Sequence, residues 1–306
     1  MKTNRHFAIV YDDQCPLCSA YTLWFVRGKW IQQADRISFS EIEKNKWGEW
    51  IDISRAKNEI PVAELQSGTI FYGVEGLTKI LAQRYPVIER VAAISPVKYF
   101  LSRLYKIISF NRRIIVPAKA CHTKFDCAPD FNLKYRISFM ILSAIISSII
   151  TFLFGASVNE TISNNPWQSG FYFLLISGTG WVLQILFVLF LKVRTRFSRT
   201  GILSIPMKSG GRVREGQAFD YASHLSVIML AGVLVLIPSI AINFLSGHVI
   251  LPVTILSLCI SGGVMFLQHW KRVRLLGISK WWNALWLMSL YGGALFWIFF
   301  LQLYKP

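Results

Sequence analysis

Five long apolar runs occupy the C-terminal half of the chain and limit what it can fold into. The runs lie at about residues 137–155, 171–191, 224–245, 249–268 and 281–303. Each is close to the roughly 20 residues that a helix needs to cross a bilayer. Hydrophobic residues make up 53% of the whole chain and charged residues only 16%, a balance that also favours membrane spans. Residues 137–306 are therefore predicted to form an all-α transmembrane bundle of about five spans.

The positive charges of this region lie almost entirely between the apolar runs. The net charge of the chain is +17. The segment before the first run is strongly basic, and the loops after the second and fourth runs carry seven and four Lys or Arg residues, whereas the loops after the first and third carry none. By the positive-inside rule, this alternation predicts a cytoplasmic N-terminus, five crossings and a C-terminus outside. We expect an integral protein of a bacterial inner (plasma) membrane, with lipid as a partner. A nucleic-acid partner is not expected, because the charge flanks membrane segments.

The first 97 residues are nearly neutral, and residues 1–116 show the pattern of a separate α/β domain. Periodicity and turn residues predict a strand at 7–11, a helix from Pro16 to about Gly28, a strand at 36–40, a solvated helix over 41–59, hairpin strands at 61–66 and 69–73, and a helix at 74–84. Two more helices are expected at 87–94 and 96–116, the second of them basic and amphipathic. Residues 117–136 then form a basic juxtamembrane linker.

A Cys-x-x-Cys pair, Cys15 and Cys18, stands where the first strand gives way to the first helix. A cysteine at a helix N-terminus has a lowered pKa, and a second thiol one turn later can resolve a mixed disulfide. Cys15 is therefore the expected nucleophile and Cys18 the expected resolving thiol. The carboxylate of Asp12 would raise the thiol pKa values or relay a proton to or from Cys18. The alternatives are half of a zinc site and two inert buried cysteines.

This order of elements, with a dithiol at the first strand–helix junction, indicates a thioredoxin-like α/β domain. The segment YDDQCPLC also resembles the signature of the DCC family of predicted thiol-disulfide oxidoreductases, in which Asp12, Cys15 and Cys18 match the Asp-x-x-Cys-x-x-Cys hallmark. Tyr11 and Pro16 match as well, while an aspartate follows Asp12 where the family usually has glycine. The resemblance extends over about residues 5–116, including the basic segment LYKIISFNRRII, and implies thiol–disulfide exchange.

Two prolines and two further cysteines complete the candidate site. Pro61 is expected to follow a cis peptide bond beside the dithiol and, with Pro16, to shape a substrate groove; the alternative is an ordinary proline that opens a strand. Cys121 and Cys127 could form a second dithiol that passes electrons towards the membrane, a local disulfide or a metal clip. We favour the simpler alternative, that they are two unrelated juxtamembrane cysteines.

These features predict a membrane-anchored thiol-disulfide oxidoreductase that acts on a disulfide-containing protein or a small thiol. Its redox group would be the Cys15–Cys18 disulfide itself, with no metal and no other cofactor. The alternative is a redox-sensing membrane protein that binds a partner without significant turnover. A third reading, an anchor clipped by zinc, would use Cys15 and Cys18 together with Cys121 and Cys127.

Overall fold

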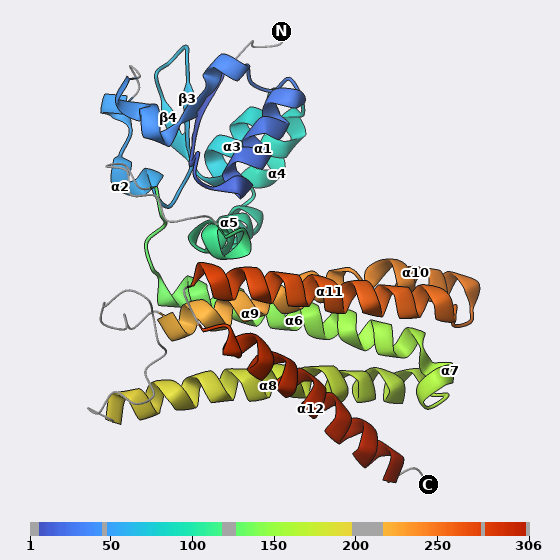
Figure 1. Ribbon diagram of the computed structural model, residues 1–306. Coiled ribbons are helices and arrows are strands. Elements are labelled where there is room, and N and C mark those ends of the chain that lie inside the picture. Colours follow the sequence, from blue (N-terminus) through green and yellow to red (C-terminus); the bar gives the residue numbers. More distant parts are fainter. Residues whose placement is uncertain (1–5, 45–47, 118–126, 198–216, 277–278, 304–306) are drawn as a thin grey trace. The chain divides into compact units, whose positions relative to one another are not determined.

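The computed structural model describes residues 6–44, 48–117, 127–197, 217–276 and 279–303 (Figure 1). The chain divides into two compact units, residues 1–139 and 140–306. The first unit holds a small mixed sheet with helices, and the second is helical.

The first unit contains all the strands among the described residues. Its regular elements are β1 (Phe7–Tyr11), α1 (Pro16–Arg27), β2 (Arg36–Ser38), α2 (Ile53–Ala56), β3 (Pro61–Glu64), β4 (Ile70–Tyr72), α3 (Val74–Ala82), α4 (Pro86–Ala93) and α5 (Ser95–Ile115). Strand β1 has the bounds predicted from its apolar sequence. The hairpin strands and the helices that follow them also form near the expected positions.

The four strands form a mixed sheet in the order β2-β1-β3-β4. Strand β1 pairs in parallel with β2, and α1 provides the crossover that a parallel pair requires. Strand β3 runs antiparallel to both β1 and β4. This topology confirms the predicted thioredoxin-like α/β fold and places β1, which leads to the dithiol, in the middle of the sheet.

Alternate residues of β1 enter two different cores, as the period of a strand requires. Phe7 and Ile9 join a cluster with side chains of α1 and α3, among them Ile80. Ala8 and Val10 point to the opposite face, where the segments between β2 and β3 cover them. Both faces of β1 are therefore buried, so the loop that follows it starts from a rigid base.

The predicted helix over 41–59 is wrong. Two short 3₁₀ segments, Phe39–Lys44 and Gly48–Trp50, precede the four-residue α2. Asp52 starts α2 anew, because its side chain accepts hydrogen bonds from the backbone N–H groups of Ser54 and Arg55. The apolar side chains of this region lie on one face of the sheet, and that packing outweighs the helix propensity.

The predicted cis peptide bond before Pro61 is also wrong. No cis peptide bond occurs among the described residues, so the Ile60–Pro61 bond is trans. Pro61 opens β3 and pairs with Tyr72, a position where the missing N–H does no harm. The Ile60 carbonyl accepts a hydrogen bond from Gly73 N–H at 2.9 Å, which continues the ladder across this junction. The alternative reading, a proline that opens a strand, describes the structure.

The helices that are long and apolar enough to cross a membrane lie in the second unit, except for the first turns of α6. The five membrane-capable segments are Leu133–Ser157, Pro166–Leu186, Asp220–Ser246, Leu251–Leu275 and Trp281–Leu301. They belong to α6 (Leu133–Ser157), α8 (Pro166–Phe197), α9 (Gln217–Leu234) with α10 (Ile237–Ser246), α11 (Leu251–Leu275) and α12 (Trp281–Leu303), while α7 (Asn159–Ile162) is short. Pro238 lies in the first turn of α10 and explains the break after α9. The prediction of about five membrane-capable helices is confirmed.

A chain of buried polar side chains ties four of these helices together. His269 of α11 lies 2.9 Å from the hydroxyl of Tyr221 on α9 and 2.8 Å from the amide oxygen of Asn283 on α12. The Gln184 amide of α8 donates to Tyr221, and Ser289 donates to Gln184. Hydrogen bonds between apolar helices fix which helix neighbours which.

Candidate active site

The dithiol lies at the junction of β1 and α1. Cys15 is the N-cap residue of α1, its N–H donates to the Asp12 carbonyl at 3.1 Å, and Pro16 follows in the first turn. Cys18 lies one turn further along the helix. The exposed fraction is 0% for Cys15 and 6% for Cys18, and both are free thiols. The sequence therefore placed the pair correctly at a helix N-terminus, although it gave no sign that Cys15 is completely covered.

The two thiols have opposite pKa shifts. The hydrogen bond from the Cys18 side chain is the main influence on Cys15 and lowers its pKa to about 6, against the effect of burial. The same hydrogen bond and burial raise the pKa of Cys18 far above its usual range. At neutral pH Cys15 is therefore the thiolate and Cys18 the proton-bearing donor, which is the division of labour that dithiol exchange needs.

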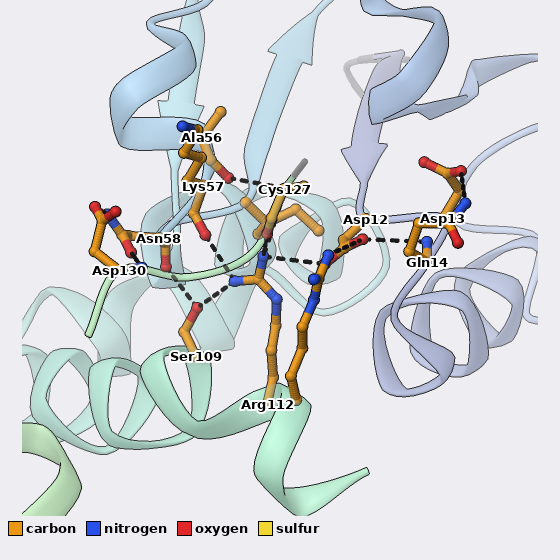
Figure 2. A network of polar contacts seen from close by, with 12 residues as sticks. Asp12, Asp13, Gln14, Ala56, Lys57, Asn58, Ser109, Arg112, Cys127 and Asp130 are labelled. Carbon is orange, nitrogen blue, oxygen red and sulfur yellow. Dashed lines mark hydrogen bonds and ion pairs between the residues drawn. The ribbon is translucent and has the colours of Figure 1, made fainter. Parts of the chain in front are cut away.

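Two arginines at the C-terminal end of α5 hold the carboxylate of Asp12 beside the dithiol. The Asp12 side chain is 2% exposed and lies 3.3 Å from a terminal nitrogen of Arg112 and 3.3 Å from one of Arg113 (Figure 2). The backbone N–H of Gln14 also donates to Asp12 Oδ1 at 3.1 Å. Two guanidinium groups against one carboxylate leave a net positive charge near the thiols. The sequence analysis expected the Asp12 carboxylate to raise the pKa values of the two thiols. The positive charge of the arginines opposes that effect.

Arg112 connects three segments of the domain. Its guanidinium donates to the Lys57 carbonyl at 2.9 Å and to the Ser109 hydroxyl at 3.4 Å. It also donates to the Cys127 carbonyl and lies 3.5 Å from the Cys127 sulfur (Figure 2). Burial works to lower the pKa of Arg112, but the negative forms of Cys18, Cys127 and Asp12 outweigh it and raise that pKa. The arginine therefore stays charged.

The sequence analysis missed Arg112 and Arg113 as site residues. The segment LYKIISFNRRII was noted only as basic and as part of a family resemblance. A signal was present, because the polar run 111–113 is flanked by the apolar residues Phe110 and Ile114 near the end of the helix. The burial of the two arginines depends on contacts with residues about 100 positions earlier, which no local pattern reports.

The aspartate at position 13, where the resembled family usually has glycine, causes no visible strain. Among the described residues, positive φ angles outside glycine occur only at Lys29 and Asn164. The Asp13 carboxylate accepts hydrogen bonds from the Gln14 amide and from the backbone N–H of Ser40. The turn therefore adopts a conformation that any residue can take.

A cavity of about 210 Å³ opens beside Cys18. Its walls are mostly apolar, and its polar lining consists of Asp12, Cys18, Tyr21, Tyr105, Ser109, Arg112 and Cys127. Burial raises the pKa of both tyrosines, that of Tyr105 to about 12, so both remain neutral. Cys18 thus faces a space that accepts an apolar group, with one fixed cation at its wall.

The two prolines that were expected to shape a substrate groove do not line this cavity. Pro16 is exposed in the first turn of α1, and Pro61 is buried in β3. Among the described residues that line the cavity, Ile60 represents the β3 segment, and neither proline is present. A groove over the dithiol that involves either proline stays a prediction.

The second pair of cysteines is only partly described. Cys127 is 4% exposed and lines the same cavity as Cys18. Cys121 lies outside the described residues, so the predicted second dithiol and the zinc clip cannot be traced. Within the described part of the chain, no three His, Cys, Asp or Glu side chains are grouped so that they could hold a metal ion.

A mixed four-stranded sheet with a buried dithiol at the N-terminus of α1 defines a thioredoxin-like dithiol domain. Comparison with family models agrees with this class: residues 9–116 match the family described as DCC1-like thiol-disulfide oxidoreductase. The matched residues run from β1 to just beyond α5 and so include Asp12, both thiols and Arg112. No curated protein and no solved structure was found to match the chain.

Proposed function

We propose that the chain is a membrane-anchored thiol-disulfide oxidoreductase. The observation that carries the proposal is the pair of opposite pKa shifts at Cys15 and Cys18 on a helix N-terminus. Two inert buried cysteines would not require a hydrogen bond in which one thiol stabilises the thiolate of the other. The family match over residues 9–116 supports the same reaction class.

The proposed reaction is a two-step exchange. The Cys15 thiolate attacks one sulfur of a substrate disulfide, a mixed disulfide forms and the first substrate thiolate leaves. Cys18 then loses its proton and attacks the Cys15 sulfur, which releases the second substrate thiol and leaves a Cys15–Cys18 disulfide. Two electrons pass to the substrate. Asp12 lines the cavity with Cys18, and a role for its carboxylate as acceptor of the Cys18 proton stays part of the proposal.

The five apolar helices support a location in a membrane, and the charge pattern of the loops supports an orientation. We infer that the dithiol domain and the N-terminus are cytoplasmic and that the C-terminus lies outside, in a bacterial inner membrane. A reducing compartment favours a cycling dithiol over a permanent disulfide. Substrates would be disulfide-containing proteins or small disulfides that reach the cytoplasmic surface.

The direct test uses the full chain without substitutions. Purified protein is reduced, freed of reductant and mixed with one equivalent of a small disulfide such as glutathione disulfide. We expect two substrate thiols to be released per chain and peptide mapping to find a Cys15–Cys18 disulfide. If both cysteines remain alkylatable while the disulfide stays intact, the proposed function is wrong.

The same reaction should depend on pH as the titration of Cys15 dictates. Because the Cys15 pKa is lowered to about 6, the reactive thiolate is lost only when the pH falls through that value. Stopped-flow measurement should show a rate that rises about tenfold per pH unit below pH 6 and levels off above about pH 7. A rate that still climbs steeply above pH 8 would indicate an unperturbed thiol.

One observation favours the alternative function, redox sensing. Cys15 has no exposed surface, so a large protein substrate cannot reach it without movement of its cover. A sensor would complete the single exchange and then turn over slowly. Steady-state turnover with excess reductant separates the two functions, because an enzyme regenerates its dithiol many times within minutes.

A further inference from the structure

The cavity beside the dithiol brings a third thiol to Cys18. Cys18 and Cys127 both line it, whereas Cys15 does not. The Cys127 backbone is held at this place, because its carbonyl accepts a hydrogen bond from the buried Arg112. The residue belongs to the segment that leads from α5 to α6, and its side chain packs on the face of the sheet that carries Ala8 and Val10. A thiol from outside the strand–helix motif therefore shares this cavity with the resolving thiol.

Two polar groups meet the Cys127 sulfur. The Ala56 carbonyl accepts its S–H at 3.9 Å, and Arg112 donates to the sulfur at 3.5 Å. The first contact suits the protonated thiol and the second suits the thiolate, so the sulfur has a partner in either state. The charge of Arg112 also acts on Cys18 and Cys15, where it favours the thiolate forms. One buried cation thus serves three thiols.

We propose that Cys127 is a third redox-active thiol, which exchanges with the Cys15–Cys18 disulfide to form a Cys18–Cys127 disulfide. The proposal rests on the proposed function, since that reaction supplies the Cys15–Cys18 disulfide. In this exchange Cys127 attacks the sulfur of Cys18, which lines the cavity, and the covered sulfur of Cys15 is released.

The exchange needs no further oxidant. Cys127 loses its proton to water, and its thiolate attacks the Cys18 sulfur. The Cys15–Cys18 bond breaks, the Cys18–Cys127 bond forms and Cys15 leaves as a thiolate. A thiol of low pKa is a good leaving group, and Cys15 meets this condition. The number of disulfides in the chain is unchanged, and the net release of a proton makes the exchange more favourable as the pH rises.

The product would join α1 covalently to the segment just before α6. In the reduced chain, non-covalent contacts with Arg112, Ala56 and Asn58 hold that segment. In the exchanged state the attachment becomes a covalent bond, while Cys15 regains its thiolate. Oxidation at the dithiol would thereby fix residue 127 covalently to α1.

The experiment follows the disulfides over time in the full chain. Reduced protein receives one equivalent of glutathione disulfide at pH 8, and samples are quenched in acid, alkylated and mapped by mass spectrometry. We expect the Cys15–Cys18 disulfide first, then a Cys18–Cys127 cross-linked peptide with an equal gain in alkylated Cys15. If the Cys15–Cys18 disulfide forms and the cross-link never appears, this inference is overturned while the proposed function stands. If neither disulfide forms, the proposed function itself fails.

A second measurement tests whether the two sulfurs can meet. In a Cys15→Ser chain treated with diamide, we expect an intramolecular Cys18–Cys127 disulfide, and a Cys259→Ser substitution on this background should not change its yield. Cys259 is an exposed residue of α11, far in sequence from the dithiol, and is the matched control. A cross-link from Cys18 to Cys121 instead of Cys127, or a yield that falls with Cys259→Ser, would contradict the assignment.

Discussion

A Cys15→Ser variant is expected to reduce a small disulfide at least about 100-fold more slowly than the wild type, because a serine hydroxyl stays protonated and attacks sulfur poorly. In the wild type, the pKa of Cys15 is lowered to about 6 by the Cys18 hydrogen bond, so most of the thiol is ionised at pH 7. The substitution removes this thiolate and changes the volume of a buried side chain little. The measurement is the rate of thiol release from glutathione disulfide by the full chain.

A Cys18→Ala variant is the companion to this substitution. It removes the donor that stabilises the Cys15 thiolate, so the pKa of Cys15 should rise towards its ordinary value. At pH 7 the thiolate fraction would then fall by a factor of about 10 or more. Thiolate absorbance at 240 nm, titrated in the wild type and in Cys18→Ala, reports this shift directly. The attack by Cys15 should still occur, and the mixed disulfide should accumulate because no Cys18 thiol resolves it.

Cys259→Ser serves as the control for thiol count, since Cys259 is exposed on α11 and has no part in the site. Its rate should equal that of the wild type. If Cys15→Ser and Cys259→Ser react at the same rate, the dithiol is not the reactive group. The domain would then have a thioredoxin-like fold but would not catalyse the proposed thiol–disulfide exchange.

The parts of this site that the sequence predicted are those that local order determines. The apolar run of β1, the proline after Cys15 and the spacing of the two cysteines fix a strand, a turn and a helix N-terminus within a dozen residues. The membrane-capable helices were equally accessible, because run length alone specifies them. Helices α6, α8 and α11 extend beyond their apolar runs because polar residues at the ends of those runs continue the helix.

The parts that the sequence did not predict depend on contacts between distant segments. Arg112 reaches Asp12 across 100 positions of sequence, and Cys127 reaches the cavity from a segment that looked like a linker. The region after β2 failed for a related reason: its apolar residues pack onto the sheet, so tertiary contact outweighs local propensity. The cis bond expected before Pro61 came from a fold-level analogy and not from the residues around it, and the structure has a trans bond there.

Replacing Arg112 by methionine is expected to lower the opening free energy of the β1 region by about 3–5 kcal/mol, the usual cost of removing one partner of a buried ion pair. The arginine and aspartate side chains are 7% and 2% exposed, so solvent cannot replace the lost charge. The Lys57 and Cys127 carbonyls would also lose their donor. Arg113 still faces Asp12, which places the expected loss towards the lower end of that range. Hydrogen exchange of β1 amides, measured by mass spectrometry on the full chain, gives the opening free energy.

The matched control is Arg103→Met, the same substitution on the same helix at an exposed position. Arg103 lies 5.1 Å from the Tyr99 ring, a contact worth about 0.5–1 kcal/mol at an exposed site, so its loss should be small. The two variants share helix propensity and side-chain chemistry, and they differ in burial and in the partner that is left behind. Equal protection of β1 in both variants would mean that Asp12 is satisfied without Arg112. A selective loss in Arg112→Met, together with a rise in the pKa of Cys15, would instead tie the stability of the domain and the reactivity of its thiol to one buried cation.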